Sequence, residues 1–216
     1  MKVKGFTFNP FFENTYIIWD ESSRECAIID PGMAEPGEEE EFKAFVKNSS
    51  LKVKYLINTH CHIDHILGVA YIKREYDPVY LIPEKDLLLF ENAETQAQMF
   101  DVTINKLPKP DKYLSESENI NLGNESIRNI FTPGHSPGEF SLYAEESNFC
   151  ITGDVLFKES IGRTDLLGGD YNTLINSIRS KLFTLPDEVV IYPGHGDEST
   201  IGYEKQHNPF LIEAFK

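Results

Sequence analysis

The feature that most constrains the fold of this 216-residue chain is a repeated order of segments. Four times, a short run of apolar, β-forming residues ends and a histidine or aspartate follows within about four residues. The four pairs are Ile57 with His60, Phe131 with His135, Ile151 with Asp154, and Ile191 with His195. Side chains placed just past strand ends can converge on one rim of a sheet, where rigid scaffolds carry chemistry. The sequence therefore predicts a sheet-based fold with one polar site at its strand ends.

The rest of the chain predicts a mixture of strands and helices. Short apolar runs bounded by turn residues indicate strands near 16–19, 26–29, 53–57, 79–82, 127–131, 140–143, 149–151 and 189–192. Apolar residues at helical spacing indicate helices near 37–48, 66–76, 84–100 and 172–183. The segment 108–124 is polar and turn-rich, and no linker divides the chain. We expect one α/β domain that spans residues 1–216.

The densest group of candidate metal ligands is the string Thr59-His60-Cys61-His62-Ile63-Asp64-His65. With the three residues that follow the later strands, the candidates are His60, His62, Asp64, His65, His135, Asp154 and His195. Imidazole and carboxylate together suit zinc, iron or manganese. Seven ligands exceed what one tetrahedral ion uses, but they suffice for two ions that share a bridge, an arrangement that performs hydrolysis.

Local geometry supports this interpretation of the string. Residues two apart on an extended segment point the same way, so His60 and His62 can bind one ion while Cys61 turns away as an inert thiol. A glycine precedes His135, Asp154 and His195, and a residue without a side chain permits tight turns and close approach to a site.

Composition argues against several classes of partner. Acidic residues outnumber basic ones by 35 to 20, and a net charge of −15 disfavours nucleic acid. No apolar run is long enough to span a bilayer, and the first residues are too polar for a secretory signal. Three cysteines, an odd count without framework spacing, fit a reducing compartment. We expect a cytoplasmic protein that acts on a small molecule; the oligomeric state is left open.

The string from Thr59 to His65, followed in order by Gly-His, Gly-Asp and Gly-His loops, resembles the metallo-β-lactamase superfamily. The resemblance covers nearly the whole chain and includes Asp30-Pro31-Gly32. It implies an αββα sandwich of two mixed sheets with helices outside. It also implies two divalent ions, zinc first with iron or manganese as alternatives. The implied ligands are His60, His62 and His135 for one ion, Asp64, His65 and His195 for the other, and Asp154 as the bridge.

Within the superfamily, the chain is most similar to the glyoxalase II branch of hydroxyacylglutathione hydrolases. The segments that carry this likeness are 132–138, 152–157, 160–165 and 192–196. The likeness implies hydrolysis of a hydroxyacyl thioester, such as S-lactoylglutathione, by a metal-bridging hydroxide, with Asp64 and Asp154 in the catalytic centre. Full-length members add a helical domain, whereas 21 residues follow His195 here. We therefore expect the short, single-domain bacterial type, and the thiol carrier stays open.

Several residues allow two interpretations each. Asp30 is either an acceptor that steadies a ligand histidine or a turn residue. Arg163 either binds the polar end of a substrate or pairs with Asp165 and stiffens its loop. His207, before a turn, is expected at the surface or at a helix end.

Two rival activities also remain. In a persulfide dioxygenase, one iron would bind His60 or His62, His135 and Asp154; that branch carries a cysteine where this chain has Ile161. The dinuclear site could instead hydrolyse a lactone or another ester. A nuclease, a flavodiiron reductase and a zinc-stabilised interaction domain fit the sequence less well, because none matches its length, charge and ligand number together.

Overall fold

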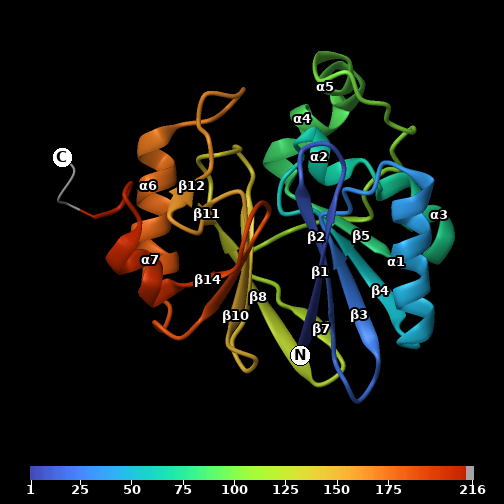
Figure 1. Ribbon diagram of the computed structural model, residues 1–216, viewed down its shortest axis with the longest axis horizontal. Helices are drawn as coiled ribbons and strands as arrows, with labels where there is room; N and C mark the ends of the chain where they lie inside the picture. Colours follow the sequence, from blue (N-terminus) through green and yellow to red (C-terminus); the bar gives the residue numbers. More distant parts are fainter. Residues whose placement is uncertain (213–216) are drawn as a thin grey trace.

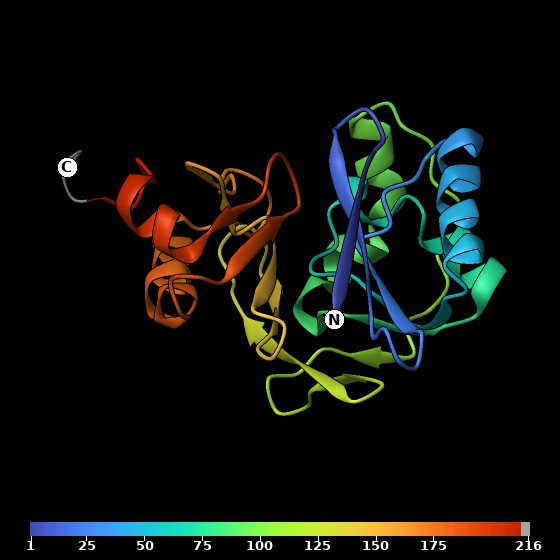
Figure 2. The same ribbon diagram turned by 60° about the horizontal axis from the view of Figure 1, so that its bottom comes forward.

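Two mixed sheets face each other, and helices cover the outer face of each sheet, in the computed structural model, which describes residues 1–212 (Figure 1 and Figure 2). The first half of the chain builds one sheet with its helices, and the second half builds the other. Among the described residues, no helix is long and apolar enough to cross a membrane.

The first sheet contains six strands in sequence order. They are β1 (Lys2–Phe8), β2 (Glu13–Trp19), β3 (Glu25–Ile29), β4 (Lys52–Ile57), β5 (Val79–Ile82) and β6 (Lys112–Tyr113). The pairs from β1 to β3 are antiparallel, and those from β3 to β6 are parallel. Its helical segments are α1 (Pro36–Asn48), α2 (Ile63–Ile66), α3 (Val69–Tyr76), the 3₁₀ turn η1 (Glu84–Asp86), α4 (Leu87–Glu91) and α5 (Ala93–Met99).

The second sheet has the strand order β14-β13-β10-β9-β8-β7. The bounds are β7 (Ile120–Leu122), β8 (Glu125–Phe131), β9 (Phe140–Ala144), β10 (Phe149–Gly153), β13 (Val190–Pro193) and β14 (Ser199–Thr200). A small hairpin of β11 (Leu156–Phe157) and β12 (Ser160–Ile161) follows β10. Helices α6 (Tyr171–Ser180) and α7 (Ile201–His207) and the 3₁₀ turn η2 (Leu182–Thr184) lie on the outer side.

Several strands of each sheet are buried on both faces, and this requires a layer of helices outside each sheet as well as contact between the sheets. Successive strand residues point to opposite faces, so a strand with two buried faces reads as a continuous apolar run. Ile17 and Ile28 pack into the core beneath the first set of helices, whereas their neighbours Ile18 and Ile29 pack between the two sheets. A third core lies between the second sheet and α6 and α7. This arrangement confirms the expected αββα sandwich.

The eight expected strands are present, with shifts of a few residues at their ends. The helices expected near 37–48 and 172–183 correspond to α1 and α6. The helix expected near 66–76 corresponds to α3 but starts three residues later, after a break that separates it from α2. The single helix expected over 84–100 was wrong as stated, because that segment is divided into η1, α4 and α5. The segment 108–124 contains β6 and β7 as well as turns, and strand β1 was not anticipated.

A tertiary contact accounts for the first helix break, and a local contact between a side chain and the backbone accounts for the second. At Gly68, the backbone N–H donates to Pro31 O at 2.7 Å, and a Cβ there would collide with Met33. At Asn92, the side-chain amide donates to Leu88 O at 2.7 Å, so a side chain competes for a helical carbonyl. Apolar periodicity reports neither kind of contact.

Candidate metal centre

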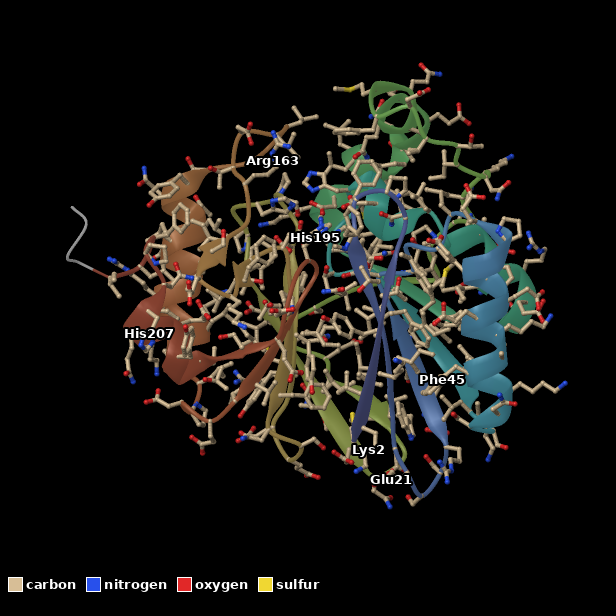
Figure 3. All side chains as sticks on the ribbon, viewed as in Figure 1. Lys2, Glu21, Phe45, Arg163, His195 and His207 are labelled. Carbon is tan, nitrogen blue, oxygen red and sulfur yellow. The ribbon has the colours of Figure 1, made fainter. Side chains whose placement is uncertain are left out.

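All seven candidate ligands lie together, at the end of the sandwich where β4, β8, β10 and β13 finish. In Figure 3, His195 lies between the two halves of the molecule and Arg163 lies near it at the same end. The sixth histidine, His207, lies on the outer side at the end of α7, where its ring stacks on Tyr203. The expectation that His207 belongs to a helix end is confirmed.

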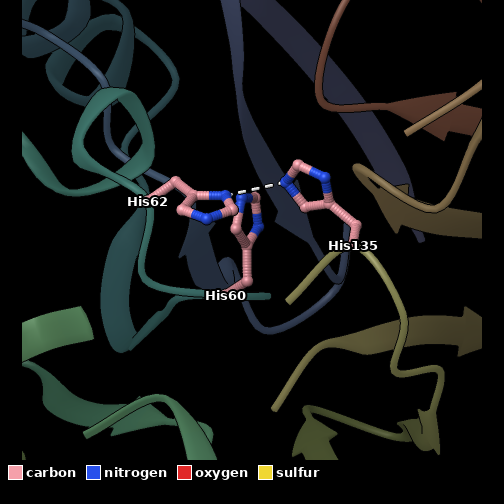
Figure 4. Close-up of side chains that lie close together, drawn as sticks. All are labelled: His60, His62 and His135. Carbon is pink, nitrogen blue, oxygen red and sulfur yellow. Dashed lines mark hydrogen bonds between the residues drawn. The ribbon is translucent and has the colours of Figure 1, made fainter. Parts of the chain in front are cut away.

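His60, His62 and His135 form the first group of the centre (Figure 4). Their ring nitrogens lie within 4.8 Å of one another, and Nδ1 of His62 is 2.7 Å from Nε2 of His135. The loop after β4 supplies two of these rings and the loop after β8 supplies the third. Three converging imidazole nitrogens offer one face of a tetrahedral ion site.

Asp64, His65 and His195 form the second group. Oδ2 of Asp64 lies 3.1 Å from Nε2 of His195 and 3.7 Å from Nε2 of His65. Asp64 and His65 lie in α2, the short helix that starts directly after the first two histidines. The turn from extended loop to helix therefore directs the four ligands of one string to two neighbouring positions.

The carboxylate of Asp154 reaches both groups. Its Oδ1 lies 3.4 Å from Nε2 of His65, and its Oδ2 lies 3.5 Å from Nε2 of both His135 and His195. One oxygen thus faces the second group, and the other faces a histidine of each group. This placement is what a carboxylate needs in order to bridge two ions.

Several buried polar atoms of the centre have no hydrogen-bond partner. They include Nε2 of His60, Nε2 of His65 and Oδ1 of Asp154. An unpaired buried polar group costs about 1–3 kcal/mol, and native structures contain few of them. A divalent cation would satisfy such lone pairs, and the imidazole and carboxylate donors fit zinc, iron or manganese. The residues present therefore fit a pair of metal ions.

The two groups differ in their electrostatics. Burial lowers the pKa of His60 and His135, and it lowers the pKa of His62 to about 3, so this group offers neutral imidazoles. Burial acts the same way on His65, but the carboxylates of Asp64 and Asp154 outweigh it and raise the pKa of His65. A metal requires neutral imidazole, so a cation that binds there must displace protons.

The carboxylate of Asp30 lies behind His65. Its Oδ2 is 3.3 Å from Nδ1 of His65, the ring nitrogen opposite the one that faces Asp64 and Asp154. It also accepts two hydrogen bonds from Thr59, from the backbone N–H at 2.7 Å and from the hydroxyl at 2.7 Å. These contacts favour the interpretation of Asp30 as an acceptor for His65 over that of a simple turn residue. Asp30 also lies in a turn, because its backbone is left-handed, at φ +49°.

Sequence reasoning missed three buried carboxylates beside the centre, those of Glu13, Glu139 and Asp86, and the last two hold its loops in place. Glu139 accepts a hydrogen bond from the backbone N–H of Asp154 at 2.6 Å and lies 3.6 Å from Nδ1 of His60. Asp86 accepts from the backbone of Cys61 at 3.1 Å, from the Ser136 hydroxyl at 2.8 Å and from the backbone of Gly138 at 2.6 Å. Asp86 thereby joins the two loops that carry the first histidine group. No motif or spacing marks any of the three.

Two of the glycines act as the sequence suggested. Gly153 has a φ of +52°, in the left-handed region that glycine adopts without strain. A Cβ at Gly194 would collide with the Asp154 carboxylate and would lie 2.7 Å from Cε1 of His65.

Cys61 is fully buried and packs in the core beneath the first set of helices, so its thiol turns away from the centre.

Arg163 contributes to the centre in a way that sequence reasoning did not foresee. Its backbone carbonyl lies 2.7 Å from Nδ1 of His135 and can accept a hydrogen bond from the N–H of that ring nitrogen. Its guanidinium donates to both carboxylate oxygens of Asp165, each at 2.7 Å. The pairing of Arg163 with Asp165, one of the two interpretations of this loop, is present. The side chain also lines the space above the centre.

That space is a cavity of about 640 Å³ with the metal centre as its floor. His62, Asp64, His135, Asp154 and His195 lie on the floor. Helices α4 and α5 form one wall, and the segment 161–167 forms another. A molecule of modest size can therefore reach the centre from outside.

Comparison with known proteins agrees with this geometry. The family model described as the metallo-β-lactamase superfamily matches residues 8–195. A curated relative, the hydroxyacylglutathione hydrolase GloC of Haemophilus influenzae, is 38% identical over 213 residues, which cover 98% of each chain. Among solved structures, BLEG-1 B3 metallo-β-lactamase superposes with a TM-score of 0.89 at 32% identity and covers 97% of this chain and 99% of its own. TTHA1623 in a di-iron-bound form superposes with a TM-score of 0.85 at 35% identity, covering 96% and 100%.

Proposed function

Because the chain belongs to the metallo-β-lactamase superfamily and is a metallo-hydrolase, we propose that it hydrolyses a hydroxyacyl thioester of the S-lactoylglutathione type. The similarity to GloC, over nearly the full length of both chains, supports this substrate class. The observation that carries the proposal is the placement of Asp154 between two ligand groups, because a bridged metal pair is suited to hydrolysis.

Each residue of the centre has a part in this proposal. His60, His62 and His135 would hold one ion, Asp64, His65 and His195 the other, and Asp154 would span both. Two divalent ions, when bound, would supply a water whose pKa falls from about 15.7 to near 7 and would stabilise charge on the carbonyl oxygen. The Asp30 carboxylate would accept a hydrogen bond from the Nδ1–H of His65 and so fix the orientation of that ring.

The reaction needs little further help from the protein. The oxygen of water adds to the carbonyl carbon, the carbon–sulfur bond breaks, and the thiolate leaves. The water loses both of its protons, of which one is taken up by the thiolate and the other is released to solvent. Because a thiolate is a good leaving group, no strong general acid is required. Arg163 is the candidate to contact a carboxylate of the substrate.

Zinc is the metal we propose first, and iron is the main alternative. His and Asp ligands accept zinc, iron and manganese. The similarity to a protein solved in a di-iron-bound form keeps iron in the proposal.

The three cysteines are free, buried thiols, which agrees with a cytoplasmic setting.

The test combines metal analysis with a substrate panel. We expect purified, metal-replete protein to hold about two ions per chain and to cleave S-lactoylglutathione. The panel also contains a lactone, a β-lactam, because BLEG-1 is described as a metallo-β-lactamase, and glutathione persulfide with oxygen uptake as the readout. His207→Gln is the matched control, because it removes a histidine outside the centre.

Each outcome of the panel has a distinct meaning. Two ions per chain with thioester turnover would support the proposal. One iron per chain with oxygen uptake would instead favour the persulfide dioxygenase. Turnover of the lactone or the β-lactam alone, with the metal pair present, would keep the hydrolase and exclude the thioester.

A further inference from the structure

The walls of the cavity above the centre are mainly apolar on both sides, although Asn92, Thr95 and Gln96 also line the α4–α5 side. Leu88, Met99 and Phe100 line it from α4, α5 and the residue after α5. Ile161, Leu166 and Leu167 line it from the opposite segment. The two walls belong to different halves of the chain and enclose a space that is continuous with the metal centre.

Several of these side chains are unusually exposed for their size. The exposed fractions are 61% for Leu88, 74% for Met99 and 67% for Leu167. Contiguous exposed apolar side chains mark binding grooves more often than they mark ordinary surface. Because this group surrounds the entrance to the metal centre, the substrate itself is the occupant that the site implies.

The small number of charged side chains in the cavity also favours an apolar substrate. Among the described residues that line it, Arg163 is the one lysine or arginine. Its guanidinium already donates to both carboxylate oxygens of Asp165. A glutathione group carries two carboxylates and an ammonium at neutral pH, so it would have to compete with Asp165 for this single cation. The walls therefore provide mainly apolar contacts, which suit a hydrocarbon chain, and they provide one cation, already paired with Asp165, for the charged groups of a tripeptide.

We propose that this cavity binds an apolar chain of the substrate, so that the enzyme prefers thioesters with an extended hydrocarbon part over S-lactoylglutathione. The chain can belong to the acyl group or to the thiol, because both extend from the carbonyl carbon held at the centre. This inference rests on the proposed thioester hydrolysis and specifies its substrate class. The products are a carboxylate and a thiol, formed by the addition of one water.

The first experiment measures kcat/KM for two series of thioesters with metal-loaded protein. One series keeps N-acetylcysteamine as the thiol and lengthens the acyl group from acetyl through butyryl and hexanoyl to octanoyl. The other keeps the acetyl group and lengthens an alkyl thiol from ethyl to hexyl. Complete burial of a methylene corresponds to about 0.8 kcal/mol, or about fourfold. We expect a rise of two- to fourfold per methylene in one series, which identifies the part that carries the chain.

The second experiment tests the wall itself with substitutions. Leu88→Gln with Met99→Gln should lower the ratio of octanoyl to acetyl kcat/KM by about tenfold or more, since it replaces two apolar contacts. Phe210→Gln is the matched control, because Phe210 is also an exposed apolar residue, at 46%, but lies outside the cavity lining. The control should leave the ratio unchanged. An equal drop in both would overturn the assignment of the wall.

A binding measurement separates this inference from the proposed function. Calorimetry compares the methyl and hexyl thioethers of N-acetylcysteamine, which cannot be hydrolysed, on the metal-loaded protein. If no thioester is cleaved but the hexyl compound binds at least about tenfold more tightly, the thioester function fails and the apolar site stands. If thioesters are cleaved with no dependence on chain length, and S-lactoylglutathione is the best substrate, the inference is overturned while the function stands.

Discussion

Asp86 is a buried carboxylate whose replacement should change the pH dependence of stability in a defined direction. Burial raises its pKa from 3.8 to about 6, against three hydrogen bonds that favour the charged form. A raised acid pKa means that the folded state binds more protons than the unfolded state between these two values. The free energy of unfolding therefore falls as pH rises through this range.

The expected size follows from the shift. A change of one pKa unit corresponds to 1.36 kcal/mol, so a rise from 3.8 to about 6 corresponds to about 3 kcal/mol. Asp86→Asn keeps the shape of the side chain but cannot titrate. The stability of the wild type relative to this variant should therefore decrease by about 2–3 kcal/mol between pH 4 and pH 7.

The assay is urea unfolding of both proteins at intervals between pH 4 and pH 7.5, with a chelator present. Titrations that the two proteins share, including those of the histidines, cancel in the difference. Asp111→Asn is the control of opposite sign, because hydrogen bonds from the Tyr80 backbone and from Lys73 lower the pKa of Asp111. Its contribution is lost only as pH falls below about 4, so the difference between the wild type and Asp111→Asn should not decrease as pH rises across the assayed range. A wild-type minus Asp86→Asn difference that is flat or increases with pH would refute the argument.

Three further predictions concern the centre. Asp154→Asn should lose one metal equivalent and at least about 100-fold in activity, because it removes the charge that holds two cations together; near wild-type turnover would exclude the bridging role. Asp30→Asn should weaken metal binding by about 10- to 100-fold in a chelator competition, because the group that faces Nδ1 of His65 loses its negative charge. An unchanged affinity would mean that Asp30 acts only as a turn residue. Cys61 should resist alkylation in the native protein, as burial raises the pKa of its thiol, and should react after denaturation; mass spectrometry of both states decides this.

The sequence alone determined eight of the strands and the set of candidate ligands, whereas the four-layer fold was expected from the resemblance to a known family. Apolar runs report burial locally, and an uninterrupted run such as Ala27-Ile28-Ile29 requires cover on both faces, which four layers provide. The positions of His60, His135, Asp154 and His195 after strand ends predicted that they meet, and the structure brings them together.

Only the tertiary structure decided what surrounds those ligands. Asp86 bonds to residues 25 to 52 positions away, and Glu139 reaches the backbone of Asp154 across 15 positions, so no local spacing could reveal either role. The same holds for the cavity walls, where Met99 and Leu167 come from opposite halves of the chain. Periodicity records which face of an element is buried, whereas packing of distant elements decides which polar groups meet and which apolar side chains stay open to a substrate.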